Sequence, residues 1–199
     1  MTQPPADPKT DPNADPGGYV TVSSRIAYRN PWTAVREDII RRPNGKTGLY
    51  GVVERGDFVV ILPVGQDGNG EPTVTLVRQY RYPVQAYLWE LPMGMWEDRP
   101  EAPPHEVAGG ELREETGLRA RTLVHAGILY QGAGYSSQKG HVYLATGLTQ
   151  GPPEPEDTEE GMTCHTIALS RFEDMIRTGE ITCMVTIAAF GLVKLKGLI

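Results

Sequence analysis

Cysteine is scarce in this sequence, which has only Cys164 and Cys183 among its 199 residues. Two thiols at this separation match no spacing of a cysteine-based metal site, and they are too few for a disulfide framework. A reducing, cytoplasmic compartment is therefore the expected setting, with a bridge between the two cysteines as the alternative.

A long apolar run and a surplus of positive charge are also missing. No stretch of about 18 or more apolar residues occurs, so no transmembrane helix is expected. The formal net charge is −6, whereas nonspecific binding to nucleic acid or to an anionic membrane needs an excess of Lys and Arg. Neither partner is expected. A polyanionic substrate would need a local basic pocket or metal ions.

Residues 1–18 lack the basic start and the apolar stretch of a secretory signal, and they are rich in Pro, Asp and Gly. This composition predicts a disordered tail. The remaining residues, 19–199, suit one domain, because single domains commonly contain about 100–200 residues. The 39% content of hydrophobic residues is enough for an ordinary globular core.

The first part of this domain shows β-strands separated by turns. β-Branched and aromatic residues at strand-like spacing predict five strands, and turn-forming segments such as Arg42–Lys46 and Gly65–Gly70 lie between them. An antiparallel meander fits this portion. The expected strands are Tyr19–Ile26, Ala34–Ile40, Leu49–Val53, Phe58–Pro63 and Thr73–Arg78.

The pattern changes in the second half. The pair Pro103-Pro104 suits a helix start and Gly117 suits a C-terminal cap, which predicts a helix over Pro104–Thr116. Strand character then returns, and a helix capped by Ser170 is expected to begin near Arg171. The other expected elements are strands Leu123–Tyr130, His141–Ala145 and Met162–Leu169 and a C-terminal helix Val185–Leu195. Strands interleaved with few helices favour a mixed α/β sandwich.

Three glutamates of the first predicted helix have the strongest chemical signal. Glu111, Glu114 and Glu115 occur at i, i+3 and i+4, which places their carboxylates on one helix face. Like charges at this spacing repel, so a neutralising cation is a natural complement, and oxygen ligands favour Mg²⁺ or Mn²⁺. Such ions bridge phosphate oxygens and activate water, as cleavage of a pyrophosphate requires. The alternative is a solvated acidic helix face.

A longer pattern surrounds these glutamates. The segment Leu91-Pro92-Met93-Gly94 is followed, after a short spacer, by Glu111-Leu112-Arg113-Glu114-Glu115-Thr116-Gly117-Leu118. This pattern resembles a Nudix box. Upstream, the stretch Val77–Pro83 running into Trp89–Pro92 is similar to the branch of that family containing ADP-ribose and nucleotide-sugar pyrophosphatases. The resemblance covers the chain from about Tyr19 to the C-terminus.

The resemblance implies an α/β fold, namely a Nudix-type α/β/α sandwich with a mixed β-sheet. An N-terminal antiparallel β-strand region, residues 19–55, would precede the sandwich. The implied cofactor is Mg²⁺, with Mn²⁺ as the alternative, held by Glu111, Glu115 and the backbone carbonyl of Met93, with Glu114 beside them. A turn at Gly94 would let the backbone approach closely, which glycine permits.

The resemblance also implies roles for residues outside the helix. A carboxylate on a loop beyond the box would orient or deprotonate water; Glu160 is the best positional match and Glu159 its rival, while an acidic surface loop is the alternative. Arg81 is expected to clamp the diphosphate, because a guanidinium engages phosphate oxygens bidentately. Glu90 is expected near substrate or metal, or else in a structural hydrogen bond.

Two further residues are substrate-binding candidates. Trp32 offers a ring on which a base can stack, although packing is the commoner role of tryptophan. Gln138 ends the segment Gly134–Gln138, which resembles a substrate loop that often ends in Glu.

The chain departs from the usual box at several positions. Gly110 stands where Nudix boxes usually carry an Arg that pairs with and orients the carboxylates, and Arg113 cannot simply substitute because it faces elsewhere than Glu111. Glycines at 109 and 110 also cost the helix about 1 kcal/mol each relative to Ala. The spacer is about two residues longer than usual, so Glu97 and Glu101 are alternative equivalents of the earlier box Glu. These departures are expected to affect rate more than fold.

The leading interpretation is a Mg²⁺-dependent Nudix pyrophosphohydrolase that cleaves a nucleoside diphosphate linked to a sugar-like group, with ADP-ribose giving AMP and ribose 5-phosphate. The main alternative, motivated by Gly110 and Gln138, is a nucleotide-sugar-binding module with little turnover. A third interpretation is a house-cleaning hydrolase of nucleoside triphosphates or dinucleotide cofactors. A homodimer formed through the N-terminal strands, Val20–Ile40, is expected by analogy.

Overall fold

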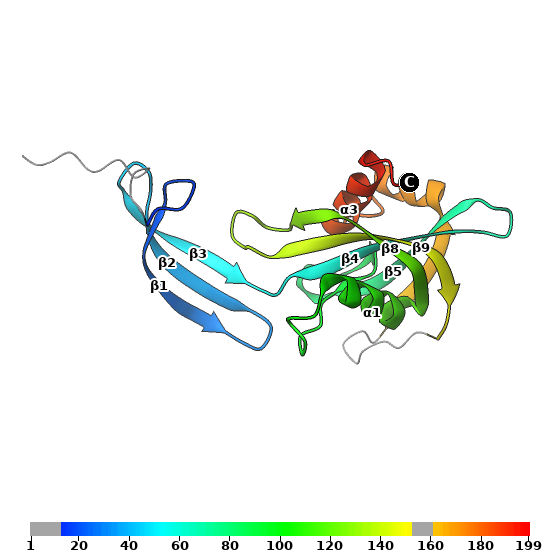
Figure 1. Cartoon of the computed structure of the whole chain (residues 1–199), viewed down its shortest axis with the longest axis horizontal. Helices are drawn as coiled ribbons and strands as arrows, with labels where there is room; N and C mark the ends of the chain where they lie inside the picture. Colours follow the sequence, from blue (N-terminus) through cyan, green and yellow to red (C-terminus); the bar gives the residue numbers. More distant parts are fainter. Residues whose placement is uncertain (1–12, 153–160) are drawn as a thin grey trace, which may run out of the picture. The chain divides into compact units, whose positions relative to one another are not determined.

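The computed structural model describes residues 13–152 and 161–199, and the chain divides into two compact units. The N-terminal unit contains the described residues up to Arg55 together with Gly132–Gln138. The second unit contains Gly56–Gln131 and, within the described residues, those from Lys139 to Ile199. Figure 1 shows the elements of both units.

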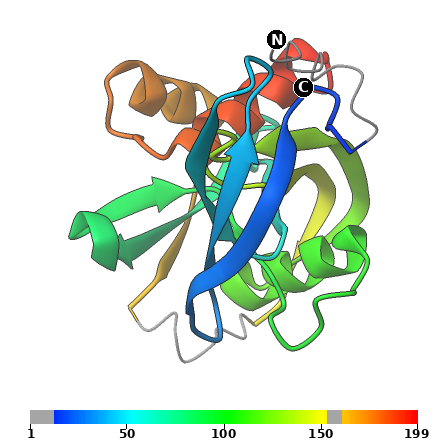
Figure 2. The same cartoon turned by 90° about the vertical axis from the view of Figure 1, so that its left-hand side faces the viewer.

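Three antiparallel strands form the sheet of the N-terminal unit, in the order β1 (Val20–Arg29), β2 (Ala34–Arg41) and β3 (Thr47–Glu54). Figure 2 shows them side by side. The turn between β2 and β3 contains Gly45 with a φ of 78°, a left-handed conformation that glycine adopts without steric cost. The predicted N-terminal antiparallel region is confirmed.

Polar contacts connect the strands of this unit. Asp38 accepts hydrogen bonds from Arg36 Nε at 2.9 Å and from the Ser24 hydroxyl at 2.6 Å, and Arg36 also pairs with Glu54. These contacts, that of Arg36 first, lower the pKa of the Asp38 carboxyl. The segment Gly132–Gln138 joins the unit through backbone and side-chain hydrogen bonds, Val53 N to Tyr135 O at 2.7 Å and Tyr50 Oη to Gly134 O at 2.8 Å.

The second unit is built on a seven-stranded mixed sheet with the order β10-β5-β4-β9-β8, in which β6 pairs with β5 and β7 with β4. The pair β4 and β9 is parallel, and the other pairs are antiparallel. A short 3₁₀ helix, Tyr82–Val84, connects β5 to β6. The strands are β4 (Phe58–Gln66), β5 (Pro72–Arg81), β6 (Ala86–Glu90), β7 (Met93–Gly94), β8 (Leu118–Tyr130), β9 (Lys139–Gln150) and β10 (Thr163–Ala168).

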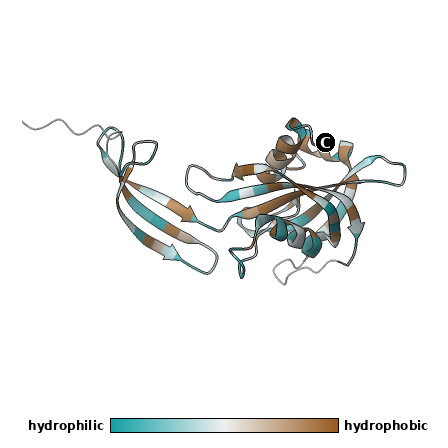
Figure 3. Cartoon of the chain, in the orientation of Figure 1, coloured by the Kyte–Doolittle hydropathy of each residue, from teal (hydrophilic) through white to brown (hydrophobic). Residues whose placement is uncertain are grey.

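Helices cover both faces of this sheet. Along β4, Val60 and Leu62 pack in one apolar cluster with α2 (Leu169–Arg177) and α3 (Met184–Leu195), while Val59 and Ile61 pack in another with α1 (Pro104–Thr116). Because successive side chains of a strand point to opposite faces, α1 must lie on one side and α2 with α3 on the other, as Figure 1 shows. Hydrophobic residues are concentrated in this sheet (Figure 3). The predicted α/β/α sandwich is confirmed.

Two local expectations are corrected, and two short strands are additional. The meander expected over residues 19–78 is divided, because β3 belongs to the N-terminal sheet and β4 pairs instead with β5, β7 and β9. Helix α2 begins at Leu169 directly after β10, so Ser170 already lies in its first turn and makes no capping hydrogen bond. The short strands β6 and β7 were not expected from the sequence, since neither is long enough for a periodic pattern.

The predicted tail, residues 1–18, lies mostly outside the described residues. Its last part forms a turn in which the Asp15 carboxylate accepts hydrogen bonds from the N–H groups of Gly17 and Tyr19, at 2.9 and 2.8 Å. Among the helices of the described stretches, 13–152 and 161–199, none is long and apolar enough to cross a membrane.

Candidate active site

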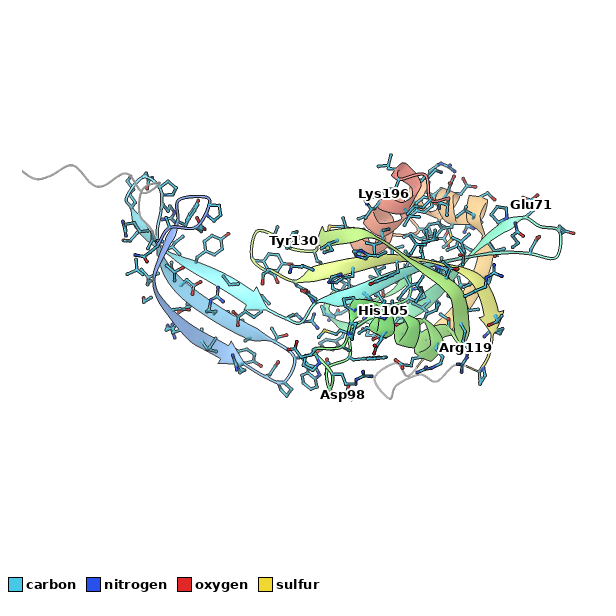
Figure 4. The ribbon with its side chains drawn as sticks, in the orientation of Figure 1. Glu71, Asp98, His105, Arg119, Tyr130 and Lys196 are labelled. Atoms are coloured by element: carbon cyan, nitrogen blue, oxygen red, sulfur yellow. The ribbon has the colours of Figure 1, made fainter. Side chains whose placement is uncertain are left out.

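Helix α1 presents the three predicted carboxylates. Pro104 occupies its first turn, where a backbone N–H is not required, and Gly117 ends it with a φ of 73°. Figure 4 labels His105 at the start of the helix and Arg119 just beyond its end. The bounds of α1 agree with those predicted from the sequence.

Two of these carboxylates are buried against β7. Glu111 and Glu115 expose only 7% and 5% of their area. The Met93 N–H donates to Glu115 Oε2 at 3.2 Å. A Cβ atom added at Gly94 would lie 2.3 Å from Glu111 Oε2, so only glycine leaves room for this carboxylate. The structure therefore brings Met93, Gly94, Glu111 and Glu115 together, as the sequence predicts.

Cys164 of β10 is influenced by the charge of the same helix. The pKa of the Cys164 thiol is raised, first by partial desolvation of its sulphur and then by the negative charge of Glu115. Cys164 as a whole residue is exposed. The carboxylates of α1 and the turn at β7 thus converge.

This convergence fits a hard divalent cation. Buried carboxylates are costly without a compensating charge, and the carboxylates of Glu111 and Glu115 and the carbonyl of Met93 offer oxygen ligands only. Within the described residues, no three His, Cys, Asp or Glu side chains form a ready metal cluster. A site here would therefore depend on the backbone carbonyl as well as on the two glutamates.

Glu114 is turned toward a different set of groups. Its Oε2 accepts a hydrogen bond from Trp96 Nε1 at 3.2 Å, and its Oε1 accepts one from the Arg113 guanidinium at 3.0 Å. Arg113 was expected to face elsewhere than Glu111, and the structure shows that it contacts the carboxylate of Glu114 instead. Trp96 was not a candidate from the sequence; its only signal was its place in the lengthened spacer after Gly94.

Arg81 and Glu90, predicted as substrate-binding residues, contact each other. Arg81 Nε donates to Glu90 Oε2 at 2.8 Å, from β5 to the neighbouring strand β6. The Glu90 side chain is only 5% exposed, whereas that of Arg81 is 38% exposed. A buried carboxylate thus orients a guanidinium that reaches solvent, which supports the structural alternative for Glu90.

Trp32 and Gln138 belong to the N-terminal unit. Trp32 is exposed in a turn in which Asn30 Oδ1 accepts hydrogen bonds from the N–H groups of Trp32 and Thr33, at 2.9 and 2.7 Å. Gln138 is buried, and its N–H donates to Ser136 Oγ at 3.2 Å. Their contact with substrate stays a prediction.

Glu159 and Glu160, the predicted general-base candidates, lie outside the described residues. The chain resumes before β10, whose first residue, Thr163, pairs with Arg78 of β5.

A cavity of about 260 Å³ lies beside the start of α1. Its lining includes Asp57, Phe58, Trp96, Arg99 and His141. The pKa of His141 is lowered, mainly by burial, against the opposing charge of Asp57, whose Oδ2 lies 3.9 Å from Nε2. The sequence did not single out these residues, because they come from separate segments.

Two family models match this chain. The Nudix domain model matches residues 55–180, and the model of the nucleoside diphosphate sugar hydrolase N-terminal domain matches residues 20–53. The boundary between the two matches falls close to the boundary between the two compact units, at Arg55.

Individual proteins are similar over most of the chain. The chain is 36% identical to an ADP-ribose pyrophosphatase of Mycobacterium tuberculosis over 171 residues, which cover 85% of this chain and 80% of the relative. It is 28% identical to an ADP-sugar pyrophosphatase of Mus musculus, over 73% of this chain and 72% of the relative. A solved structure described as an ADP compounds hydrolase shares the fold, with a TM-score of 0.78 at 22% identity, over 90% of this chain and 95% of that one.

Proposed function

Because this chain is a pyrophosphohydrolase of the Nudix family, we propose that it hydrolyses ADP-ribose to AMP and ribose 5-phosphate. The proposal rests on the two buried carboxylates of Glu111 and Glu115, held against the turn at Met93 and Gly94. The names of the relatives, ADP-ribose pyrophosphatase and ADP-sugar pyrophosphatase, support the substrate class.

Nudix hydrolases generally need a divalent cation. We propose Mg²⁺, with Mn²⁺ as the alternative, because both prefer oxygen ligands. The carboxylates of Glu111 and Glu115 and the carbonyl of Met93 would hold it. When bound, such an ion neutralises phosphate charge and lowers the pKa of bound water.

The chain's own residues would bind the diphosphate and move the proton. The Arg81 guanidinium, oriented by Glu90, would donate hydrogen bonds to phosphate oxygens. A water oxygen forms the new bond to phosphorus, and the bond from that phosphorus to the bridging oxygen breaks. Glu160, with Glu159 as its rival, is the proposed acceptor of the proton that water loses, which then goes to the leaving phosphate.

A second copy of the chain is the proposed partner of the N-terminal sheet. Large apolar side chains are exposed on this sheet, among them Val22, Tyr28 and Leu49. A small sheet with large apolar side chains exposed is marginally stable in water, so covering these side chains would stabilise the unit. We also propose a cytoplasmic location, since both cysteines are free thiols.

The test is a hydrolysis assay on a substrate panel. Purified protein is incubated with ADP-ribose, other nucleotide sugars, dinucleotide cofactors and nucleoside triphosphates, in Mg²⁺, Mn²⁺ or EDTA, and products are separated by chromatography. Metal-dependent release of AMP and ribose 5-phosphate, fastest for ADP-ribose, is expected.

A matched pair of variants controls the assay. Glu115→Gln should abolish turnover, whereas Glu71→Gln makes the same charge change at the tip of the β4 and β5 hairpin (Figure 4) and should leave it intact. Nucleotide binding without any product would overturn the proposal in favour of a non-catalytic binding module.

A further inference from the structure

The backbone of Gly110 is covered by a tryptophan ring. A Cβ atom added at Gly110 would lie 2.0 Å from Cζ2 of Trp96 and 2.9 Å from its Cε2. Both atoms belong to the rigid ring system, so no small side-chain movement would make room. The indole therefore occupies the space that a side chain at position 110 would need, and glycine at this position is required by the close approach of Trp96.

The same indole ring binds a carboxylate of the helix. Trp96 Nε1 donates to Glu114 Oε2 at 3.2 Å, while Arg113 donates to Oε1. Indole nitrogen is only a donor, so the Glu114 oxygen is the acceptor in this contact. Hydrogen bonds with an ionised acceptor are about twice as strong as neutral ones. Both oxygens of Glu114 thus accept a hydrogen bond from a neighbouring side chain.

The loop that supplies Trp96 is tied to the first turn of α1. The guanidinium of Arg99 lies over the Trp96 ring, 4.8 Å from its centroid, and pairs with Glu106 at 3.4 Å. The Arg99 N–H also donates to the Trp96 carbonyl at 3.3 Å. Asp98, labelled in Figure 4, belongs to this loop between β7 and α1. These contacts fix the plane of the indole relative to the helix.

We propose that Trp96 is a positioning residue, which does here the work that an arginine at position 110 does in other Nudix boxes. Packed on Gly110 and bonded to Glu114, it holds the helix that bears Glu111 and Glu115 in one orientation despite the two adjacent glycines. This inference rests on the proposed hydrolysis.

The kinetic test is a rescue experiment. Trp96→Phe keeps an aromatic ring but lacks the indole N–H, and kcat is expected to fall about 10- to 100-fold, as is usual for groups that support metal ligands, while KM changes little. Gly110→Arg alone should also fail, because the side chain meets the indole. The double variant with Trp96→Ala and Gly110→Arg should recover activity above both Trp96→Ala and Gly110→Arg. Trp89→Phe, a ring in β6, is the matched control and should leave kcat unchanged.

A second readout needs no turnover. The chain has three tryptophans, so the metal-free protein labelled with ¹⁵N should give three indole N–H resonances. Trp96→Phe identifies one of them. Glu114→Gln should shift that resonance upfield, because the charged acceptor is lost, and should leave the other two in place.

The outcomes separate this inference from the proposed function. Absence of hydrolysis by the wild-type protein would overturn the function, while the indole resonance would still report on the contact between Trp96 and Glu114. The positioning role would be overturned if Trp96→Phe kept the wild-type kcat, or if Glu114→Gln left the Trp96 indole resonance unchanged. Neither result would contradict the proposed hydrolysis. If the double variant were no more active than either single variant, arginine at position 110 would not replace the role of Trp96.

Discussion

The central strand of the sandwich and the first strand of the N-terminal sheet differ in what lies on their two faces. β4 is buried along Phe58–Pro63, with α1 packed on one side and α2 with α3 on the other. β1, by contrast, is exposed at every residue from Thr21 to Arg29. β4 therefore belongs to a packed core, whereas β1 belongs to a small sheet with little core of its own.

The contacts that stabilise the two regions differ accordingly. The sandwich is stabilised by apolar side chains from several elements, whereas the N-terminal sheet relies on backbone pairing and on the contacts of Asp38 with Ser24 and Arg36. Catalytic groups need to be held rigidly. The proposed metal ligands Glu111 and Glu115 are accordingly on the well-packed unit.

A pair of carboxylate-to-amide variants gives the largest expected contrast. Glu111→Gln should lower kcat by at least about a hundredfold, because it removes a proposed metal ligand, and even outer-shell changes cost up to that much. Asp38→Asn should leave kcat unchanged but lower the free energy of unfolding by about 1.5–3 kcal/mol, since bonds to a charged group are lost. Steady-state kinetics and urea unfolding measure both. An equal loss of kcat in the two variants would contradict the assignment of catalysis to the sandwich and not to the N-terminal sheet.

A leucine in each region tests the difference in packing. Leu62 is 0% exposed and Leu49 is 58% exposed. Leu62→Ala should lower the free energy of unfolding by about 2–5 kcal/mol through loss of burial and an unfilled cavity. Leu49→Ala should change it by no more than about 0.5 kcal/mol in dilute protein. Urea unfolding at several protein concentrations decides: a large, concentration-dependent cost at Leu49 would mean that a second copy covers it.

The polar contacts of the N-terminal sheet are tested at Ser24. Ser24→Ala removes the hydroxyl that donates to Asp38 at 2.6 Å and should cost about 1 kcal/mol of unfolding free energy. In an Asp38→Ala background the same change should cost nearly nothing, because the acceptor is already absent. If Ser24→Ala costs as much in both backgrounds, the hydrogen bond is not what stabilises the sheet.

The smallest expected effect is a difference between the two regions in how their stability depends on pH. The lowered pKa of His141 means that the native state disfavours its protonation, so the stability of the sandwich should fall as the pH drops below about 6.5. Asp57 opposes this shift, and His125 and Lys139 add to it. The pKa of Asp38 is also lowered, so its contribution to the stability of the N-terminal sheet is retained until the pH falls below about 3.9.

Unfolding curves between pH 8 and pH 3 measure this order of loss. His141→Gln should flatten the upper part of the profile and leave the lower part unchanged. A profile that keeps its fall near neutral pH in this variant would assign the fall to another group.

Local signals in the sequence were sufficient for most elements. The helix Pro104–Thr116 has prolines at its start and a glycine at its end, and both act within one turn, so its bounds were predicted correctly. The pairing of strands was not: β4 pairs in parallel with β9, which follows it by a long stretch of chain. Side-chain alternation indicates a strand but not its neighbour.

The candidate site shows the same limit. Glu111 and Glu115 could be found because they share one helix face, and Met93 and Gly94 because they belong to the same motif. Trp96 could not be found in this way, because its proposed role depends on tertiary contacts with Gly110 and Glu114. The glycine that looked like a missing arginine is the place where the indole fits.

By itself, then, the sequence determined the class of chemistry and the α/β composition, because residue type and periodicity are properties of short segments. Tertiary structure alone decided that β3 and β4 belong to different sheets, that Arg81 pairs with Glu90 and that Trp96 fills the space above Gly110. Each of these depends on distances between segments that the chain brings together only on folding.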